Sequence, residues 1–192
     1  MSTRSPIISV TGSSGAGTST VKHTFDQIFR REGVRAACIE GDAFHRYDRQ
    51  GMKNAIALHE ERGEHHFSHF GPDANLFAEL EEVFRAYGEH GTGRTRRYVH
   101  DDEEAVKLGC PSGTFTQWHD IEEPSDLLFY EGLHGAVVHG DIDIARLADL
   151  KIGVVPVINL EWIQKVHRDR STRGYSTEAV TETILRRMPD YI

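Results

Sequence analysis

Near its start the chain has an apolar run that enters a glycine-rich turn and continues into a segment compatible with a helix. The run is Ile8-Ser9-Val10-Thr11, and the turn is Gly12-Ser13-Ser14-Gly15-Ala16-Gly17-Thr18-Ser19-Thr20. This order is typical of a phosphate-binding P-loop, G-x-x-x-x-G-K-[ST]. Gly12 and Gly17 have the required spacing, Ser19 stands where the hydroxyl on the Mg²⁺ side belongs, and Thr18 replaces the usual lysine.

Residues 12–20 are therefore predicted to hold the phosphates of a nucleotide. Glycines let successive backbone N–H groups turn toward one anion, and the following helix adds its unpaired amides and the positive end of its dipole. Because Thr18 carries no charge, another cation has to stabilise the transferred phosphoryl group. The alternative is a glycine-rich turn without a ligand, which the agreement of strand, glycine spacing, Ser19 and helix disfavours.

Composition and charge argue against several other classes of protein. The 192 residues suffice for one domain with a full core, and the net charge of −8 argues against nucleic-acid binding through bulk charge. No apolar stretch approaches the length of a membrane span, and the N-terminus has no signal-peptide core. Two cysteines, Cys38 and Cys110, make no disulfide framework. We expect a cytoplasmic protein, with Cys38 in the core.

Apolar strands alternate with helical patterns, which predicts an α/β fold with a mostly parallel sheet flanked by helices. Strands are expected at 6–11, 34–40, 127–130 and 151–158, the last buried on both faces. Helices are expected at 19–32, twice within 51–88 with the second ending at Gly88, at 160–172 and at 177–188. In the first helix Val21, Phe25 and Ile28 should form the buried stripe. Segments 95–100 and 114–120 are predicted to pair as an antiparallel ribbon.

Two carboxylates follow predicted strands, and ligands of parallel sheets bind at the carboxyl ends of the strands. Asp42 can accept the proton of an attacking hydroxyl, or it can cap the turn that follows it. Glu131 stands where P-loop proteins place a second acid on the Mg²⁺ side. A solvated charge at the strand end is the alternative for Glu131.

The predicted helix 160–172 carries charges at helical spacing. Trp162, Ile163 and Val166 can face the core, whereas the charged residues share one stripe. That stripe contains Lys165, Arg168, Asp169 and Arg173. We predict that Lys165 and Arg168 supply the charge missing at Thr18, in a lid over the phosphates that Arg173 closes. A solvated helix face is the alternative.

Two further basic sets suggest an acceptor that itself carries phosphate. They are His45, Arg46 and Arg49, and then Arg94, Arg96, Arg97 and His100. Surface charge that balances the acidic residues at 101–104 is the alternative. Four histidines, His59, His65, His66 and His69, match no zinc spacing, and we predict no zinc site there.

Together these segments resemble the phosphoribulokinase/uridine kinase family, and within it the bacterial (proteobacterial) phosphoribulokinases. The resemblance is carried by ISVTGSSGAGTST, IEGDAFHR, RTRRYVHDD, LLFYEGLHGAV, LKIGVVPVINLEWIQKVHRDRSTRGYSTEAV and ILRRM. Thr18 in the lysine position is a feature of that branch. The resemblance implies Mg²⁺-dependent transfer of the ATP γ-phosphoryl group to the 1-hydroxyl of D-ribulose 5-phosphate, which gives D-ribulose 1,5-bisphosphate for Calvin cycle carbon fixation.

The resemblance also implies roles for single residues. Asp42 corresponds to the catalytic base and Lys165 to the lysine near the transferred phosphate, while Ser19 and Glu131 lie on the metal side. The residues that correspond to the sugar-phosphate site and to the lid arginines are His45, Arg49, His100, Arg168 and Arg173.

Family members resembling this chain continue past the equivalent of residue 192 with further strands. We therefore expect residues 1–192 to form a single P-loop kinase domain that is incomplete at its C-terminus. The resemblance further implies a homo-oligomer that responds to NADH and AMP, without disulfide control because Ala16 replaces a cysteine. Three alternatives remain open: a nucleoside kinase of the uridine type, a truncated nucleotide-binding module without catalysis, and an NTPase switch protein.

Overall fold

The structure is a computed structural model that describes residues 5–13, 15–64, 67–121, 124–171, 174–186 and 188. Ser14 and Arg173 from the predicted site, and His65 and His66, lie outside the described residues. Within the described part of the chain, no helix has the length and apolar character needed to cross a membrane.

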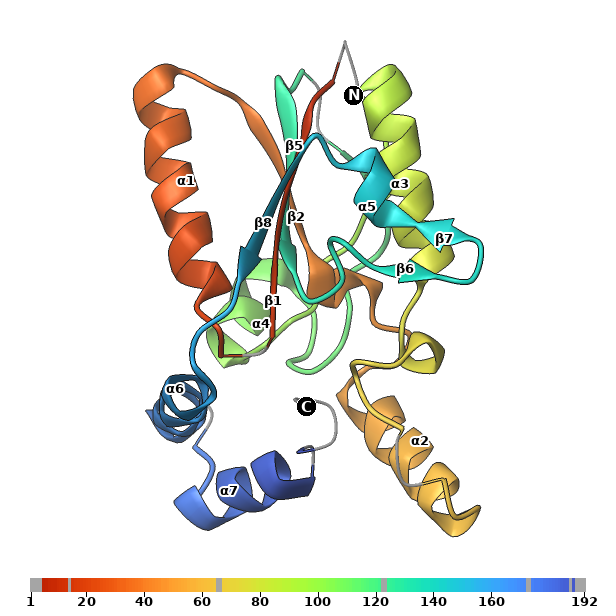
Figure 1. Cartoon of the computed structure of the whole chain (residues 1–192), viewed down its shortest axis with the longest axis vertical. Helices are drawn as coiled ribbons and strands as arrows, with labels where there is room; N and C mark the ends of the chain where they lie inside the picture. The colour runs from red at the N-terminus through yellow and green to blue at the C-terminus, as the bar shows by residue number, and fades with distance from the viewer. Residues whose placement is uncertain are drawn as a thin grey trace.

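A four-stranded parallel sheet lies at the centre of the molecule (Figure 1). Its strands, in spatial order, are β2 (Ala36–Glu40), β5 (Leu127–Gly132), β1 (Ile7–Gly12) and β8 (Leu150–Val154). All three pairings are parallel, so the four strands end at the same edge. The predicted α/β fold with a mostly parallel sheet is confirmed.

Helices cover both faces of this sheet (Figure 1). On one face α1 (Thr18–Glu32) buries Phe29 against Val10 and Phe129. On the other face α3 (Phe77–His90) and the short α5 (Ile144–Leu147) enclose the larger core cluster. The predicted stripe of α1 is wrong at one position: Ile28 is 38 % exposed, and Phe29 packs with Val21 and Phe25 instead.

Glycines and aspartates mark where the helices begin and end. Gly33 ends α1 with φ 67°, a left-handed conformation that glycine adopts without steric cost. The helix α3 runs past Gly88 to His90 and ends at Gly91. Aspartate side chains accept backbone N–H groups at the starts of α2 (Arg49–Glu61) and α4 (Asp102–Leu108).

The predicted antiparallel ribbon is present. β3 (Arg94–Thr95) pairs with β4 (His119–Asp120), and an antiparallel bridge joins Tyr98 to Phe115. The helix α4 lies between the two arms and was not predicted. The other elements are the 3₁₀ turns η1 (Gly41–Phe44) and η2 (Pro72–Ala74), the hairpin β6 (Val138–His139) and β7 (Ile142–Asp143), and the helices α6 (Ile158–Ser171) and α7 (Thr177–Arg186).

Two burial predictions are wrong for the same reason. The strand β8 ends at Val154 and is an edge of the described sheet. The residues that follow it are therefore exposed to solvent, and Val155 and Val157 are 89 % and 73 % exposed. The strand β2 is the opposite edge, and Cys38 on it is exposed rather than in the core. An apolar run at a sheet edge does not by itself indicate burial on both faces.

Replacing Phe129 by Ala should lower the free energy of unfolding by about 3–5 kcal/mol, as for other large buried aromatic rings. Phe129 is fully buried and its ring lies 5.1 Å and 5.5 Å from the rings of Phe25 and Phe29. Urea unfolding measures the change, and Val106→Ala on the exposed α4 serves as the control. Equal losses in the two variants would contradict this account of the core.

Candidate active site

The glycine turn between β1 and α1 is held by backbone contacts on both sides. Gly15 and Gly17 have φ of 104° and 100°, which L side chains rarely adopt. A Cβ at Gly12 would lie 2.7 Å from the carbonyl oxygen of Val154, so β8 leaves no room for a side chain there. These contacts explain the glycine spacing, and they place the first amides of α1 beside the loop as a site for an anion.

Thr18, which replaces the usual lysine, contacts Glu131 at the end of β5. Its hydroxyl donates to the Glu131 carboxylate. Burial raises the pKa of Glu131, whereas this hydrogen bond and the nearby Lys22 ammonium act to lower it. The structure therefore brings the loop and the predicted metal-side acid together.

A second carboxylate, Glu40, lies at the same edge of the sheet as Glu131 and was not predicted from the sequence. Glu40 ends β2 directly opposite Glu131 in the parallel register. Its Oε1 lies 2.7 Å from Lys22 Nζ on α1 and 3.7 Å from Arg97 on the ribbon. The signal was available, because both strands end in Glu-Gly, as Glu40-Gly41 and Glu131-Gly132. Lys22 also brings to this edge a cation that the sequence analysis did not consider.

Asp42 lies in the turn η1 just after β2, between two histidines. Its Oδ1 is 3.7 Å from Nε2 of His45, and its Oδ2 is 3.7 Å from Nε2 of His100. His100 comes from the chain beyond β3, more than fifty residues away. Arg49, at the start of α2, donates from Nη2 to the carbonyl oxygen of His100 at 2.7 Å. Four of the residues predicted for catalysis and for the sugar phosphate are thus brought together.

The helix α6 lies against the loop with the charged stripe that contains Lys165. Its buried residues are Glu161, Lys165 and Asp169, whereas Ile163 is 57 % exposed. Lys165 Nζ lies 3.4 Å from Asp169 Oδ2, and Arg168 donates from Nε to Asp169 Oδ1 at 2.9 Å. The expectation that Ile163 faces the core is wrong, whereas Trp162 and Val166 are partly buried. The alternative of a solvated face does not hold for Lys165 and Asp169, which are buried.

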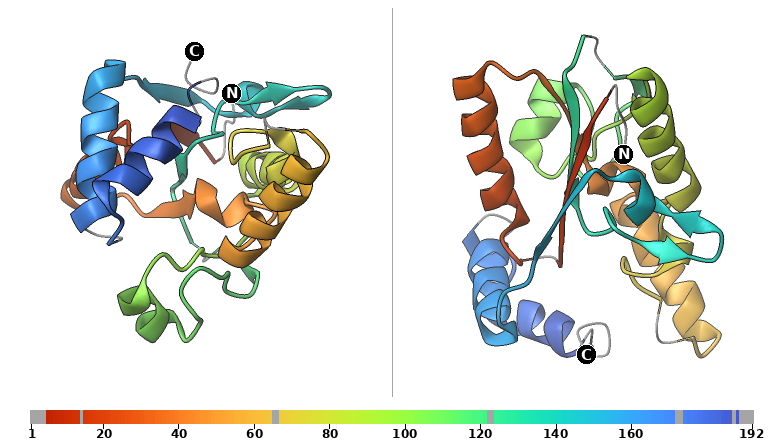
Figure 2. Two further views of the ribbon diagram at one scale, coloured as in Figure 1. Left: turned by 90° about the horizontal axis from the view of Figure 1, so that it is seen from below. Right: turned by 45° about the horizontal axis from the view of Figure 1, so that its top comes forward.

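Contacts between α6 and the glycine turn explain this orientation. Ser13 Oγ donates to Glu161 Oε1 at 2.6 Å. A Cβ at Gly15 would lie 3.3 Å from the Cβ of Lys165, so the helix packs closely on the turn. In Figures 1 and 2, α6 and α7 lie beyond the carboxyl ends of the strands on one side, and α2 lies on the other.

Two buried titratable groups support the turn that holds Asp42. The Tyr130 hydroxyl accepts from the backbone N–H of His134 at 3.3 Å, and burial raises the pKa of Tyr130. A Cβ at Gly41 would collide with this hydroxyl. His134 Nε2 lies 3.2 Å from the carbonyl oxygen of Phe70, and burial lowers the pKa of His134 to about 4.

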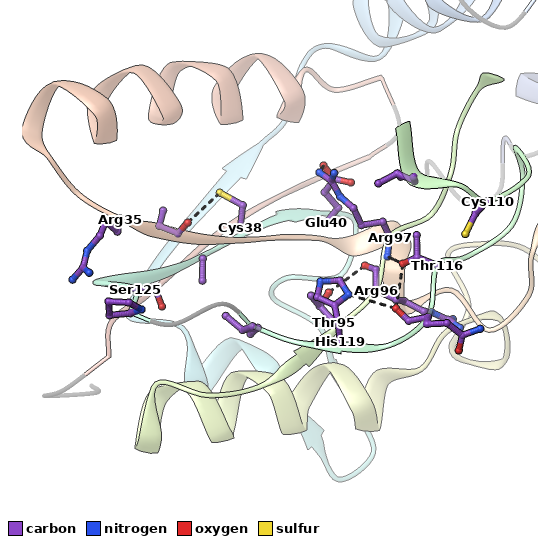
Figure 3. Close-up of a pocket in the computed structure, with 16 residues that line it drawn as sticks. Arg35, Cys38, Glu40, Thr95, Arg96, Arg97, Cys110, Thr116, His119 and Ser125 are labelled. Atoms are coloured by element: carbon purple, nitrogen blue, oxygen red, sulfur yellow. Dashed lines mark hydrogen bonds and ion pairs between the residues drawn. The ribbon is translucent and has the colours of Figure 1, made fainter. Parts of the chain in front are cut away.

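A cavity of about 800 Å³ lies beside this site, between β2 and the ribbon (Figure 3). Its lining includes Cys38, Glu40, Arg96, Arg97 and Cys110. Of the basic set predicted at 94–100, Arg96 and Arg97 line the cavity, whereas Asp42, His45 and His100 are not among its lining residues. Glu40 therefore has the cavity on one side and the Lys22 ion pair on the other.

Comparison with known proteins identifies the family. The family model "Phosphoribulokinase / Uridine kinase family" matches residues 7–192. A protein of Nitrobacter vulgaris named phosphoribulokinase is 70 % identical over 97 % of this chain and 64 % of its own length. Phosphoribulokinase 1 of Cereibacter sphaeroides is 68 % identical over 100 % of this chain and 66 % of its own length.

A solved structure agrees with these matches. The phosphoribulokinase from Rhodobacter spheroides superposes with a TM-score of 0.81 at 64 % identity, covering 96 % of this chain and 63 % of that one. The chain thus spans slightly less than two thirds of the length of these relatives. It belongs to the phosphoribulokinase/uridine kinase family.

Replacing His134 by Gln should make the free energy of unfolding less dependent on pH between about 6.5 and 4. The pKa of His134 falls from 6.5 to about 4 on folding, so the unfolded chain binds this proton more readily. The neutral ring therefore stabilises the fold fully above pH 6.5, and this contribution is lost as the pH falls toward 4.

Urea unfolding at a series of pH values measures this difference. Gln keeps an N–H for the Phe70 carbonyl but does not titrate. The exposed His119 on β4 offers the control variant His119→Gln, which should follow the parent. Parallel curves for the parent and His134→Gln would show that the buried imidazole does not contribute.

Proposed function

We propose that this member of the phosphoribulokinase/uridine kinase family transfers the γ-phosphoryl group of ATP to the 1-hydroxyl of D-ribulose 5-phosphate, as phosphoribulokinase does. The observation that carries the proposal is the position of Asp42. Its carboxylate lies between His45 and His100, at the sheet edge where the glycine loop and Glu131 also end. A proton acceptor, a site for phosphates and a set of groups suited to a second phosphate thus share one edge.

In this proposal the phosphates of ATP lie on the loop formed by residues 12–20. Backbone amides at a helix start bind anions without any charged side chain, which suits a loop that has Thr18 instead of lysine. Carboxylate and hydroxyl oxygens are the ligands that Mg²⁺ prefers, so Glu131 and Ser19 would hold the ion together with phosphate oxygens and water. The bound ion would neutralise charge on the phosphates.

Asp42 acts as the general base. Its carboxylate takes the proton from the 1-hydroxyl while that oxygen forms the bond to the γ-phosphorus, and the bond from phosphorus to the ADP oxygen breaks. His45, His100 and Arg49 bind the phosphate that the acceptor already carries. That Asp42 is half-exposed rather than hydrogen-bonded to the backbone of its own turn favours this role over capping.

Lys165 and Arg168 supply positive charge to the transferring phosphoryl group, with Arg173 as a further lid arginine. The packing of Lys165 on Gly15 of the loop supports this role, and the ion pairs with Asp169 hold Lys165 and Arg168 together on one side of α6. A compact ammonium and a forked guanidinium can both stabilise the equatorial oxygens of the transition state.

The family resemblance alone also supports proposals about the location, assembly and regulation of the enzyme. We propose a cytoplasmic homo-oligomer whose activity responds to NADH and AMP. Light scattering of the purified chain tests the oligomer, and a monomer at assay concentrations would refute it. Kinase activity that changes with neither NADH nor AMP would refute the effector response.

A coupled assay of ADP release with three acceptors tests the proposed reaction. We expect turnover with ribulose 5-phosphate and Mg²⁺, and none with uridine or with water alone, because only the sugar phosphate matches the basic side chains around Asp42. Turnover with uridine would favour the nucleoside kinase, and hydrolysis without acceptor would favour the NTPase switch. Binding of ATP without any turnover would favour the non-catalytic module.

Asp42→Asn should lower kcat by about 10²–10⁴-fold, the usual contribution of a general base, while the dissociation constant for ATP stays within about twofold. Asparagine keeps the shape of the side chain but accepts no proton. Asp141→Asn, in the exposed turn between β6 and β7, is the matched control. An unchanged kcat in Asp42→Asn would remove Asp42 from the chemistry.

A further inference from the structure

We propose that Arg96 is the positioning residue that fixes the turn carrying Asp42, and that its charge does not bind the phosphate of the acceptor. The proposal rests on the proposed function, in which Asp42 is the base. It assigns a single role to one member of the basic set at 94–100, which the sequence analysis grouped together as a site for phosphate.

The position of Asp42 depends on a short turn. η1 spans only Gly41–Phe44, and the chain is already extended again at His45. The backbone N–H of His45 donates to the carbonyl oxygen of Asp42 at a long 3.3 Å. A catalytic carboxylate has to be held within a fraction of an ångström, so contacts from outside the turn must supply the rigidity.

Arg96 supplies two of those contacts. Its Nε donates to the carbonyl oxygen of Ala43 at 2.8 Å, and its Nη2 donates to the carbonyl oxygen of His45 at 2.7 Å. These carbonyls come one and three residues after Asp42. The two donors of a planar guanidinium have a fixed separation, so they also fix the distance between the two carbonyls, which the single ammonium of a lysine cannot do.

Aromatic rings hold the guanidinium in place. Arg96 Cζ lies 3.6 Å from the centre of the Phe115 ring and 4.7 Å from that of Trp118. The Trp118 ring also packs on Phe44, at 5.8 Å between ring centres. The two rings and the guanidinium thus pack together and join the ribbon to η1. Burial in this contact lowers the pKa of Arg96.

The neighbouring arginines have different partners. Arg94 forms an exposed pair with Asp120 at 3.7 Å across the ribbon, and Arg97 lies 3.7 Å from Glu40. Figure 3 shows Arg96 and Arg97 side by side along the cavity, with Arg97 next to Glu40. Because the guanidinium of Arg96 donates to backbone carbonyls and stacks on rings, it acts through Asp42 rather than on the substrate.

The turn has a second support, so loss of Arg96 should loosen it without unfolding the protein. The backbone N–H of Leu76 donates to the carbonyl oxygen of Phe44 at 2.8 Å. Arg46 donates to the carbonyl oxygens of Asp73 and Asn75, both at 3.1 Å. These bonds join the turn to η2 and to the start of α3, whereas those of Arg96 join it to the ribbon.

Three variants test the proposal: Arg96→Met, Arg96→Lys and the matched control Arg85→Met, which removes an arginine that pairs with Glu81 on α3. We expect both Arg96 variants to lower kcat by about 10–100-fold, because misplacement of a catalytic group by about 1 Å costs up to about 10²-fold. The KM for ATP should stay within about twofold. Backbone amide exchange at 41–46, followed by mass spectrometry, should become faster in both, and Arg85→Met should match the parent in every measurement.

The outcomes separate this proposal from the proposed function. If Arg96→Met raises the KM for ribulose 5-phosphate and leaves kcat unchanged, Arg96 binds the acceptor and the proposal is wrong. Full rescue by Arg96→Lys would also refute it, since charge alone would then suffice. If the parent itself shows no kinase activity, the proposed function fails, and amide exchange at 41–46 decides alone: faster exchange supports the positioning role and unchanged exchange refutes it. If Arg96→Met does not fold, Arg96→Lys provides the same readouts.

Discussion

The site depends on the parallel register of β2, β5 and β1. Because Glu40 pairs with Glu131 and the end of β5 pairs with the end of β1, two carboxylates and the glycine turn reach the same level of one sheet edge. Two carboxylates at adjacent strand ends repel each other, and burial raises the free-energy cost of keeping both of them charged. Lys22 on α1 offsets this repulsion by pairing with Glu40 near Glu131.

Local signals in the sequence predicted those parts of the molecule that depend on local chemistry. Gly12, Gly15 and Gly17 lie where backbone contacts or positive φ require glycine, and Asp42 lies after its strand at the expected edge. The ribbon was predicted from two short polar-apolar segments, and its strands pair as expected. The glycine turn and Asp42 each depend on a short stretch of chain, and the ribbon, which pairs Arg94 with Asp120, spans the longest one.

Burial differs from the sequence pattern where it depends on distant partners. The face that α6 buries is set by the glycine turn, some 150 residues earlier, so Glu161 is buried and Ile163 is exposed against the usual pattern. Cys38 and the end of β8 were misassigned because helical and strand periodicity do not reveal which strands lie at the sheet edges. Glu40 was overlooked because the Glu-Gly that ends both strands becomes informative only once the two strands are known to be neighbours.

The contact between Ser13 and Glu161 has a consequence for how a polyphosphate enters the loop. A hydroxyl donates its one proton to a single acceptor at a time, and here the acceptor is a carboxylate on α6. An arriving phosphate oxygen and this carboxylate are both anions, so they compete for the same donor and repel each other. In the proposed function, binding of phosphate to the loop would therefore be coupled electrostatically to the docking of α6, the helix that carries Lys165 and Arg168.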